Sequence, residues 1–251
     1  MNYNPFSLED RTILVTGASS GIGRAIAIEC SRMGARLIIH GRSEDRLSET
    51  YKNLSGENHL MILGDLTSEE GRKELYDSLP ELDGVVFNAG IEKRQLCRMV
   101  KEEDIYAILN VNFTSIALLQ KSLLKKKKLT EGASIVMMAS RAAFAPSIGN
   151  AIYSASKGAL ISYAKVLGLE VASRRMRVNC ICPGMVFTEL TRRDAEMYGV
   201  DLNETQKSYP LGRLGIPEDI AYLTVYLLSN ASQWMTGSCI DISGGGMMVL
   251  S

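Results

Sequence analysis

Short apolar runs alternate with longer amphipathic segments along the whole chain of 251 residues. Runs such as Val85-Val86-Phe87 contain no polar side chain, which is typical of strands buried on both faces. A strand followed by a helix returns to the same sheet through a right-handed crossover, so the alternation predicts a parallel sheet with helices on both faces. The expected strands are 12–15, 36–40, 60–63, 84–87, 134–138, 177–181 and 238–242, and the expected helices are 22–33, 44–53, 68–79, 102–128, 152–173 and 217–230.

No linker-like stretch or internal repeat divides the chain. We therefore expect one domain over residues 1–251, a length compatible with a single large domain. The longest segment without a clear strand, at about 185–216, is predicted to be a substrate-binding loop, because long excursions in compact domains are often lids or binding loops.

The composition excludes several classes of partner. The 28 basic and 28 acidic side chains give no net charge, whereas nucleic-acid binding usually requires a basic excess. No run of about 18 apolar residues and no secretory signal pattern is present, so we expect no membrane association. Five cysteines, mostly in apolar segments, fit reduced thiols in the cytoplasm. The two histidines and the cysteine spacing predict no metal site.

The first expected strand leads directly into TGASSGIG at residues 16–23, where a helical pattern begins. Gly17 permits a tight turn, Gly21 lets the backbone approach a pyrophosphate, and Gly23 allows the helix to pack closely on the strand. The helix N-terminus then directs free N–H groups and its positive dipole end at phosphates. The pattern predicts dinucleotide binding by Gly17, Ser19, Ser20, Gly21, Ile22 and Gly23.

The end of the second strand bears on which dinucleotide is bound. An acidic side chain there would accept hydrogen bonds from the adenosine ribose of NAD. This chain has Gly41 followed by Arg42, and a guanidinium forms charge-assisted hydrogen bonds with a 2′-phosphate. Arg42 therefore predicts NADP as the cofactor, with NAD the less favoured alternative. Ser20 offers no second basic side chain.

Tyr153 and Lys157 are four residues apart in an expected helix and so share one face. A nearby ammonium favours the phenolate and lowers the pKa of a tyrosine from about 10. Such a tyrosine can give or take the proton of an alcohol while a hydride moves. The spacing alone is common on solvated helix faces, so its meaning depends on its partners.

Several motifs in a fixed order resemble the short, single-domain branch of the short-chain dehydrogenase/reductase family over essentially the whole chain. They are TGASSGIG, Asp65, Asn88-Ala89-Gly90, Asn112, Ser140, Tyr153 with Lys157, Pro183-Gly184, PLGRLGIPED at 210–219, and Gly244-Gly245. The resemblance implies an α/β fold of the Rossmann type, a doubly wound, seven-stranded parallel sheet with helices on both faces. It also implies an oxidoreductase that moves a hydride between a nicotinamide and an alcohol–carbonyl pair.

The resemblance also assigns roles to the catalytic positions. Tyr153 would be the general acid/base, and Ser140 would orient the substrate oxygen. Lys157 would bind the nicotinamide ribose and lower the pKa of Tyr153. Asn112 would hold a water that links Lys157 to solvent.

Further cofactor contacts follow from the same resemblance. Asp65 and Leu66 would contact the adenine, and residues 88–90 would lie beside the adenine ribose. Val186 and Thr188 would contact the nicotinamide carboxamide. The complete implied set is Asp65, Leu66, Asn88, Ala89, Gly90, Pro183, Gly184, Val186 and Thr188, with Tyr153 and Lys157.

The substrate is the least determined part of the interpretation. A 3-oxoacyl-thioester reductase is one reading, and an NAD-dependent dehydrogenase of a sugar, sterol or other small alcohol is another. A non-catalytic dinucleotide-binding regulatory subunit is a third, although the presence of all four catalytic residue types argues against it. Arg94, Arg141 and Asn150 are candidate substrate residues, and the two arginines suit a polar or anionic substrate.

The family resemblance also implies a homo-oligomer, either a dimer or a tetramer. Its members usually pair through the two long helices that are expected here at about 102–128 and 152–173. The second of these has an apolar pattern typical of a helix buried on more than one side.

Overall fold

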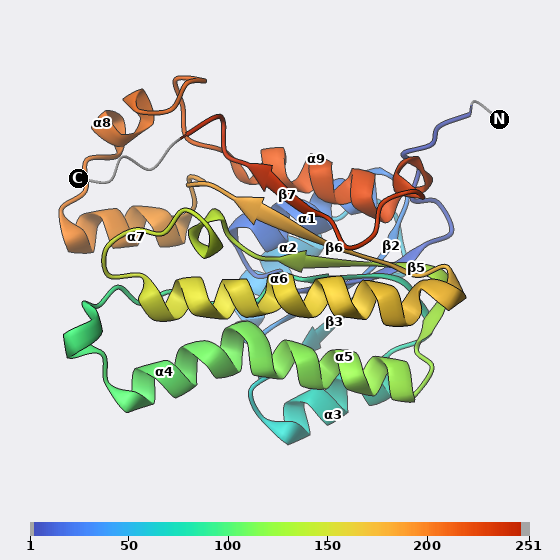
Figure 1. Ribbon diagram of the computed structural model, residues 1–251. Helices are drawn as coiled ribbons and strands as arrows, with labels where there is room; N and C mark the ends of the chain where they lie inside the picture. The colour runs from blue at the N-terminus through green and yellow to red at the C-terminus, as the bar shows by residue number, and fades with distance from the viewer. Residues whose placement is uncertain (1–2, 247–251) are drawn as a thin grey trace.

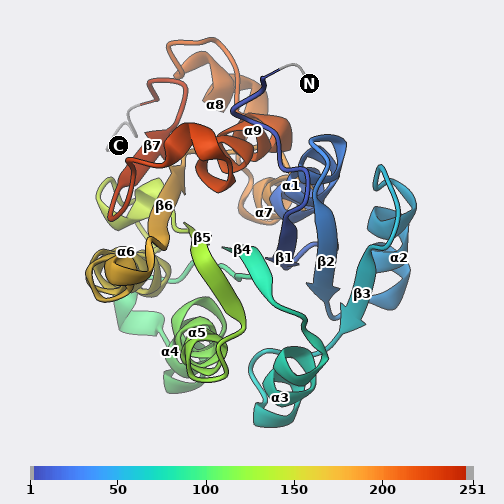
Figure 2. The ribbon, with the colours of Figure 1, turned by 90° about the vertical axis from the view of Figure 1, so that its right-hand side faces the viewer.

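A computed structural model describes residues 3–246 and contains the expected parallel sheet (Figures 1 and 2). Its order is β3-β2-β1-β4-β5-β6-β7, and every neighbouring pair is parallel. The order reverses between β1 and β4, which makes the carboxyl ends of these strands a topological switch point. This confirms the predicted fold class. The strands are β1 Thr12–Thr16, β2 Arg36–Gly41, β3 Leu60–Leu63, β4 Leu82–Phe87, β5 Leu129–Met138, β6 Arg177–Pro183 and β7 Cys239–Ile242.

Strand β5 differs most from its predicted bounds. It begins at Leu129 rather than at residue 134, and its first part contains the polar residues Thr130 and Glu131. Leu82 pairs with Leu129, and the register then shifts before Gly84 pairs with Ser134. The early part of β5 was missed because it lacks the continuous apolar run of the buried part.

The helices cover both faces of the sheet, as Figure 2 shows. Side chains of α1, α2 and α9 form one apolar cluster with the sheet, and those of α3, α5 and α6 form a second cluster on the opposite face. The two clusters share the sheet as a central layer, so both faces of the strands are buried. The helices are α1 Gly21–Arg32, α2 Glu44–Lys52, α3 Glu69–Ser78, α4 Glu102–Leu109, α5 Ser115–Lys125, α6 Ala151–Val171, α7 Glu189–Tyr198, α8 Leu202–Lys207 and α9 Pro217–Leu228.

The helix expected at 102–128 is interrupted by a π-helical turn at Asn110–Thr114, which joins α4 to α5. Glu102–Lys125 has the length and the mean hydropathy, 1.2, of a helix that could cross a membrane. However, Ile116, Leu119 and Leu123 are fully buried against the sheet. The segment is therefore a core helix of the fold.

The long segment at 185–216 forms two helices rather than an extended loop. Helices α7 and α8 lie beyond the carboxyl ends of β6 and β7, on the left in Figure 1. Val186 forms an isolated bridge with Gly215, and this bridge ties the two ends of the segment together. The segment is thereby held over the edge of the sheet where the predicted site residues lie.

Candidate active site

A cavity of about 750 Å³ lies at the carboxyl edge of the sheet. Its walls come from the segments that follow β1 to β6 and from α7 and α8, so it occupies the topological switch point. The sequence-predicted residues that line it are Gly17, Ser19, Ser20, Gly21, Ile22, Arg42, Asp65, Leu66, Asn88, Ala89, Gly90, Arg94, Ser140, Arg141, Asn150, Tyr153, Lys157, Pro183, Gly184, Val186 and Thr188. Gly23 and Asn112 are not among the lining residues and lie behind its walls.

The glycines of the first turn have steric reasons for their identity. Gly17 has a φ of +66°, and a Cβ there would lie 2.8 Å from the Cα of Ala89. A Cβ on Gly23 would lie 2.2 Å from the carbonyl oxygen of Gly17. Asn88 donates a hydrogen bond from Nδ2 to that carbonyl at 3.0 Å. The turn, helix α1 and the end of β4 are therefore packed too closely for side chains at these two positions.

The N-terminus of α1 is suited to an anion. Ser20 occupies the N-cap position, but its side chain makes no capping hydrogen bond. The first N–H groups of a helix have no partner within the helix, and with the helix dipole they favour negative charge. Ser20, Gly21 and Ile22 all line the cavity. The residues present thus fit a pyrophosphate at this point.

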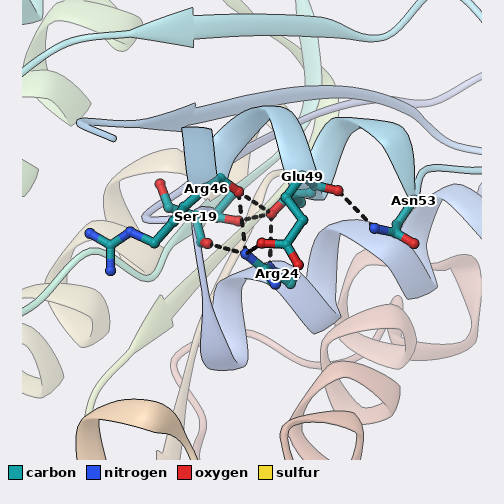
Figure 3. A network of polar contacts seen from close by, with 7 residues as sticks. Ser19, Arg24, Arg46, Glu49 and Asn53 are labelled. Atoms are coloured by element: carbon teal, nitrogen blue, oxygen red, sulfur yellow. Dashed lines mark hydrogen bonds and ion pairs between the residues drawn. The ribbon is translucent and has the colours of Figure 1, made fainter. Parts of the chain in front are cut away.

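Arg24 fixes the glycine-rich turn to helix α2, and sequence reasoning did not identify it (Figure 3). Its Nη2 donates to the carbonyl of Ser19 at 2.8 Å and forms an ion pair with Glu49 at 2.8 Å, while its Nε donates to Thr50 Oγ1 at 3.1 Å. Thr50 in turn donates to the carbonyl of Ala18 at 2.9 Å. The network holds the turn against the helix that follows β2.

Two arginines stand where β2 ends. Arg42 and Arg46 are both exposed and line the cavity, and Figure 3 shows the Arg46 guanidinium extending away from the Arg24 network. Gly41 lies directly against the glycine-rich turn, since a Cβ at this position would lie only 2.1 Å from Ser19 Oγ. The absence of a side chain at Gly41 leaves room between the turn and the two arginines. Sequence reasoning identified Arg42 but missed Arg46, although the two stand four apart and α2 begins between them.

His40 and Asp65 form the floor beside these arginines. His40 is buried, and neither ring nitrogen has a hydrogen-bond partner among the described residues. Burial lowers the pKa of His40 to about 4, so the imidazole is neutral at pH 7. A hydrogen bond from the Thr67 main chain is the largest of the influences that lower the pKa of Asp65, and Arg42 adds to it. His40 was missed because its buried position gave no signal in the sequence.

Ser140, Tyr153 and Lys157 come together on one wall of the cavity. Ser140 lies two residues after the end of β5, and Tyr153 and Lys157 lie on α6. Lys157 is buried, and its Nζ donates to the carbonyl oxygen of Met138 at 2.8 Å and lies 5.7 Å from the centroid of the Tyr153 ring. The fold thus brings Ser140 close to the two α6 residues, which the sequence analysis grouped with Ser140 only through the family resemblance.

Burial dominates the ionisation of this cluster. The pKa of Tyr153 is raised to about 12, mainly by burial and in smaller part by the Glu92 carboxylate, while a hydrogen bond with Ser140 opposes the rise. Burial also lowers the pKa of Lys157 to about 8. The expected lowering of the tyrosine pKa by Lys157 is not observed in this structure. The physical reason is that removal of the phenol from water disfavours its charged form more than the distant ammonium favours it.

Asn112 lies in the π-helical turn and is fully buried. Its Oδ1 accepts a hydrogen bond from the Ile91 main-chain N–H at 2.8 Å, and its Nδ2 donates to the Ile91 carbonyl and to Ser156 Oγ, each at 2.9 Å. The side chain therefore joins the segment after β4 to helix α6. The water-holding role of Asn112 remains a prediction.

The three candidate substrate residues are engaged with other protein groups. Arg141 donates to Ser243 Oγ at 2.6 Å and lies 3.7 Å from an Asp241 oxygen. Arg94 and Asn150 both donate to Glu92 Oε1, at 3.3 Å and 2.9 Å respectively.

Tertiary contacts add two more side chains to this wall. The Arg94 guanidinium lies 6.0 Å from the centroid of the Tyr198 ring. Glu92 and Tyr198 both line the cavity, and sequence reasoning assigned a role to neither.

Comparison with known proteins identifies the family of the chain. A family model described as short chain dehydrogenase matches residues 11–199. A 3-oxoacyl-acyl-carrier-protein reductase from Rickettsia prowazekii is 34% identical over 247 residues, which cover 96% of this chain and 99% of that protein. Carbonyl reductase family member 4 from Danio rerio is 32% identical over 244 residues, covering 96% and 99% respectively.

Solved structures give the same result. A short chain dehydrogenase/reductase family protein superposes with a TM-score of 0.85 at 29% identity, covering 97% of this chain and 100% of the other. A candidate gluconate dehydrogenase from Agrobacterium tumefaciens superposes with a TM-score of 0.90 at 27% identity, covering 99% and 100%.

Proposed function

Because the chain belongs to the short-chain dehydrogenase family, we propose that it is an NADP(H)-dependent oxidoreductase that interconverts a carbonyl and a secondary alcohol. The observation that carries this proposal is the set Ser140, Tyr153 and Lys157 on the wall of a cavity that also contains the glycine-rich turn and Arg42. The whole chain acts as one domain in this proposal, with residues 185–216 over the substrate.

The arginines after β2 support NADP rather than NAD. Arg42 and Arg46 together offer two guanidinium groups to a 2′-phosphate, and Ser19 and Ser20 supply the neighbouring turn. A guanidinium binds phosphate through paired, charge-assisted hydrogen bonds. His40 and Asp65 line the part of the cavity next to Arg42, where we place the adenosine.

In the proposed reaction, the bound nicotinamide supplies or accepts the hydride. Ser140 positions the substrate oxygen, and Tyr153 holds the proton that this oxygen gains during reduction. A pKa near 12 keeps the Tyr153 phenol protonated at pH 7, which is the form needed to give up a proton. The Lys157 ammonium has only the Met138 carbonyl as a hydrogen-bond acceptor among the described residues, so further donors are free for ribose hydroxyls.

Two substrate classes have support. The curated relatives named as 3-oxoacyl-acyl-carrier-protein reductases favour a 3-oxoacyl thioester. The charged side chains Glu92, Arg94 and Asp194 on the cavity wall favour a polar substrate such as a sugar or another small alcohol. The structural similarity to a candidate gluconate dehydrogenase points in the same direction.

The assembly and location of the protein are further parts of the proposal. Tyr106, Leu118, Val166 and Leu169 are exposed apolar side chains on α4, α5 and α6, and their burial between copies would support a dimer or tetramer. All five cysteines are free thiols, which fits a cytoplasmic location.

Cofactor titration tests the proposal first. NADPH and NADH are titrated separately, and binding is followed by the rise in melting temperature. We expect NADPH to bind more tightly, and Arg42→Ala to weaken NADPH binding by about 10- to 100-fold, since hydrogen bonds to charged groups contribute about 1.5–3 kcal/mol. NADH binding should hardly change. Arg98→Ala, which removes an exposed arginine outside the cavity, is the matched control.

Turnover is then measured by NADPH oxidation with an acetoacetyl thioester and with a panel of hydroxylated ketones. Equal affinity for the two dinucleotides would contradict the assignment of Arg42. Tight cofactor binding without turnover of any carbonyl or alcohol would replace the enzyme by a dinucleotide-binding regulatory subunit.

A further inference from the structure

Glu92 is a carboxylate on the wall of the catalytic cavity that the proposed reaction does not use. It lies two residues after Gly90 and its side chain is 20% exposed. Its negative charge is one of the influences that raise the pKa of Tyr153 and of Asp194. Glu92 and Tyr153 line the same cavity, so a substrate that Tyr153 protonates can also contact Glu92.

The carboxylate is held in one orientation by two donors. Asn150 Nδ2 and Arg94 Nε both reach Oε1, at 2.9 Å and 3.3 Å. Among the residues that the structure describes, Oε2 receives no hydrogen bond. A fixed carboxylate with one oxygen available is an acceptor placed before a ligand arrives.

Two further polar atoms of the same wall lack partners. Asn150 is only 4% exposed, and its Oδ1 is buried without a hydrogen-bond partner in the described part of the chain. Ser147 Oγ is buried and unpartnered in the same sense. Both residues line the cavity. Buried polar atoms are normally satisfied by protein, water or ligand, so these atoms are available to pair with a ligand that carries hydrogen-bonding groups.

From this arrangement we propose that Glu92 is a specificity-determining residue that accepts a hydrogen bond from a substrate hydroxyl next to the reacting carbonyl. The inference rests on the proposed oxidoreductase function and names its substrate class as hydroxylated carbonyl compounds and the corresponding polyols. An unsubstituted acyl chain offers no donor at this point, so its binding leaves the Glu92 carboxylate partly desolvated without a partner. A 3-oxoacyl thioester is then the poorer substrate.

The test compares acetoin with butanone, which differ by one hydroxyl beside the carbonyl. The value of kcat/KM is measured for each with NADPH at one pH, and the ratio of the two values is the preference. We expect a preference for acetoin of about tenfold or more, because a site that hydrogen-bonds a hydroxyl discriminates strongly against the analogue without it. Acetoacetyl-N-acetylcysteamine should give a kcat/KM closer to that of butanone.

The variant Glu92→Gln should abolish the preference. Its carbonyl can still accept from Asn150 and Arg94, which leaves an amide NH₂ where Oε2 stood and so replaces the acceptor by a donor. We expect kcat/KM for acetoin to fall about tenfold, while the value for butanone changes less than about threefold. Any effect of the lost charge on Tyr153 acts on both ketones and cancels in the ratio.

Two controls keep the inference falsifiable. Glu81→Gln makes the same chemical change at an exposed position outside the cavity and should retain the wild-type preference. The melting temperature of Glu92→Gln establishes that the variant is folded. A wild-type preference near one, or an unchanged preference in Glu92→Gln, would overturn the role of Glu92 and leave the reductase assignment standing. A lack of NADPH oxidation with every carbonyl would overturn the proposed function and this inference together.

Discussion

Replacement of Gly23 by alanine provides a direct test of how the first turn is packed. Gly23 lies on the third residue of α1, and a Cβ built there would lie 2.2 Å from the Gly17 carbonyl oxygen and 2.4 Å from Asn88 Nδ2. Ordinary van der Waals contact begins near 3.4 Å. The methyl group must therefore displace the turn and break the hydrogen bond between Asn88 and Gly17, which measures 3.0 Å.

The expected loss of stability is the sum of three effects. Overpacking of this kind costs about 1–3 kcal/mol, and loss of the Asn88 hydrogen bond costs about 1 kcal/mol more. The higher helix propensity of alanine returns up to about 1 kcal/mol. The net destabilisation of Gly23→Ala is then roughly 1–4 kcal/mol, or a fall in melting temperature of several degrees for a chain of this length.

Gly158→Ala is the matched control. Gly158 is also a helical glycine, but a Cβ there meets nothing within 4 Å, so the same substitution should stabilise the protein by about 0.5–1 kcal/mol. Both variants are unfolded in urea and titrated with NADPH. Only Gly23→Ala should weaken NADPH binding, because it moves the turn that faces the pyrophosphate. Equal stability of the two variants would refute the packing argument.

Three other properties follow from the same structure. The pKa of Lys157 falls from 10.5 to about 8 on folding. Both the folded and the unfolded chain therefore bind the proton below pH 8. Between pH 8 and 10.5 only the unfolded chain binds it, so the stability of the folded state rises with pH in this range. At pH 7, the free energy of unfolding in urea should therefore be roughly 1–3 kcal/mol higher for Lys157→Met than for the wild type, and this difference should disappear by about pH 10. A difference that does not depend on pH would be inconsistent with this. Asn112→Ala should cost about 2–4 kcal/mol in the same assay, since it leaves both main-chain groups of Ile91 without their partners, and a loss under 1 kcal/mol would argue against the bracing role. The neighbouring Cys180 thiol lowers the pKa of the exposed Cys239 thiol to about 7. At pH 7, iodoacetamide should therefore label Cys239 several-fold faster than it labels the thiol of glutathione; a slower reaction, measured by mass spectrometry, would count against the lowered pKa.

The order of the elements could be predicted because it depends on local patterns. A strand buried on both faces needs an unbroken apolar run, and residues 84–87 and 135–138 have one. The early part of β5 could not be found in this way, because Thr130 and Glu131 are partly exposed to solvent. The π turn around Asn112 was also missed, since its sequence reads as continuous helix.

In the candidate site, too, some residues are brought together by short sequence spacing and others only by tertiary packing. Tyr153 and Lys157 are neighbours on one helix, so their spacing already put them on one face. Glu92 and Asn150 are 58 positions apart, and only the packing of α6 beside the segment after β4 brings them to 2.9 Å. Arg46 lines the cavity because α2 begins beside it, and the buried His40 lines the cavity from the end of β2. Neither position could be recognised before the strands and helices were packed together.

The sequence by itself determined the parallel α/β fold and the glycine-rich turn, because these depend on residue type and short spacing. The candidate catalytic side chains were predicted through the resemblance to a known family. Only the tertiary structure decided the ionisation of Tyr153 and the polar wall opposite it. A pKa depends on how much water the fold removes and on which charges it brings near. Lys157 is buried, and Tyr153 is largely removed from water near the Glu92 carboxylate, which is distant in the sequence. That juxtaposition raised the pKa of Tyr153, whereas the Tyr–Lys pair alone predicted a lower value.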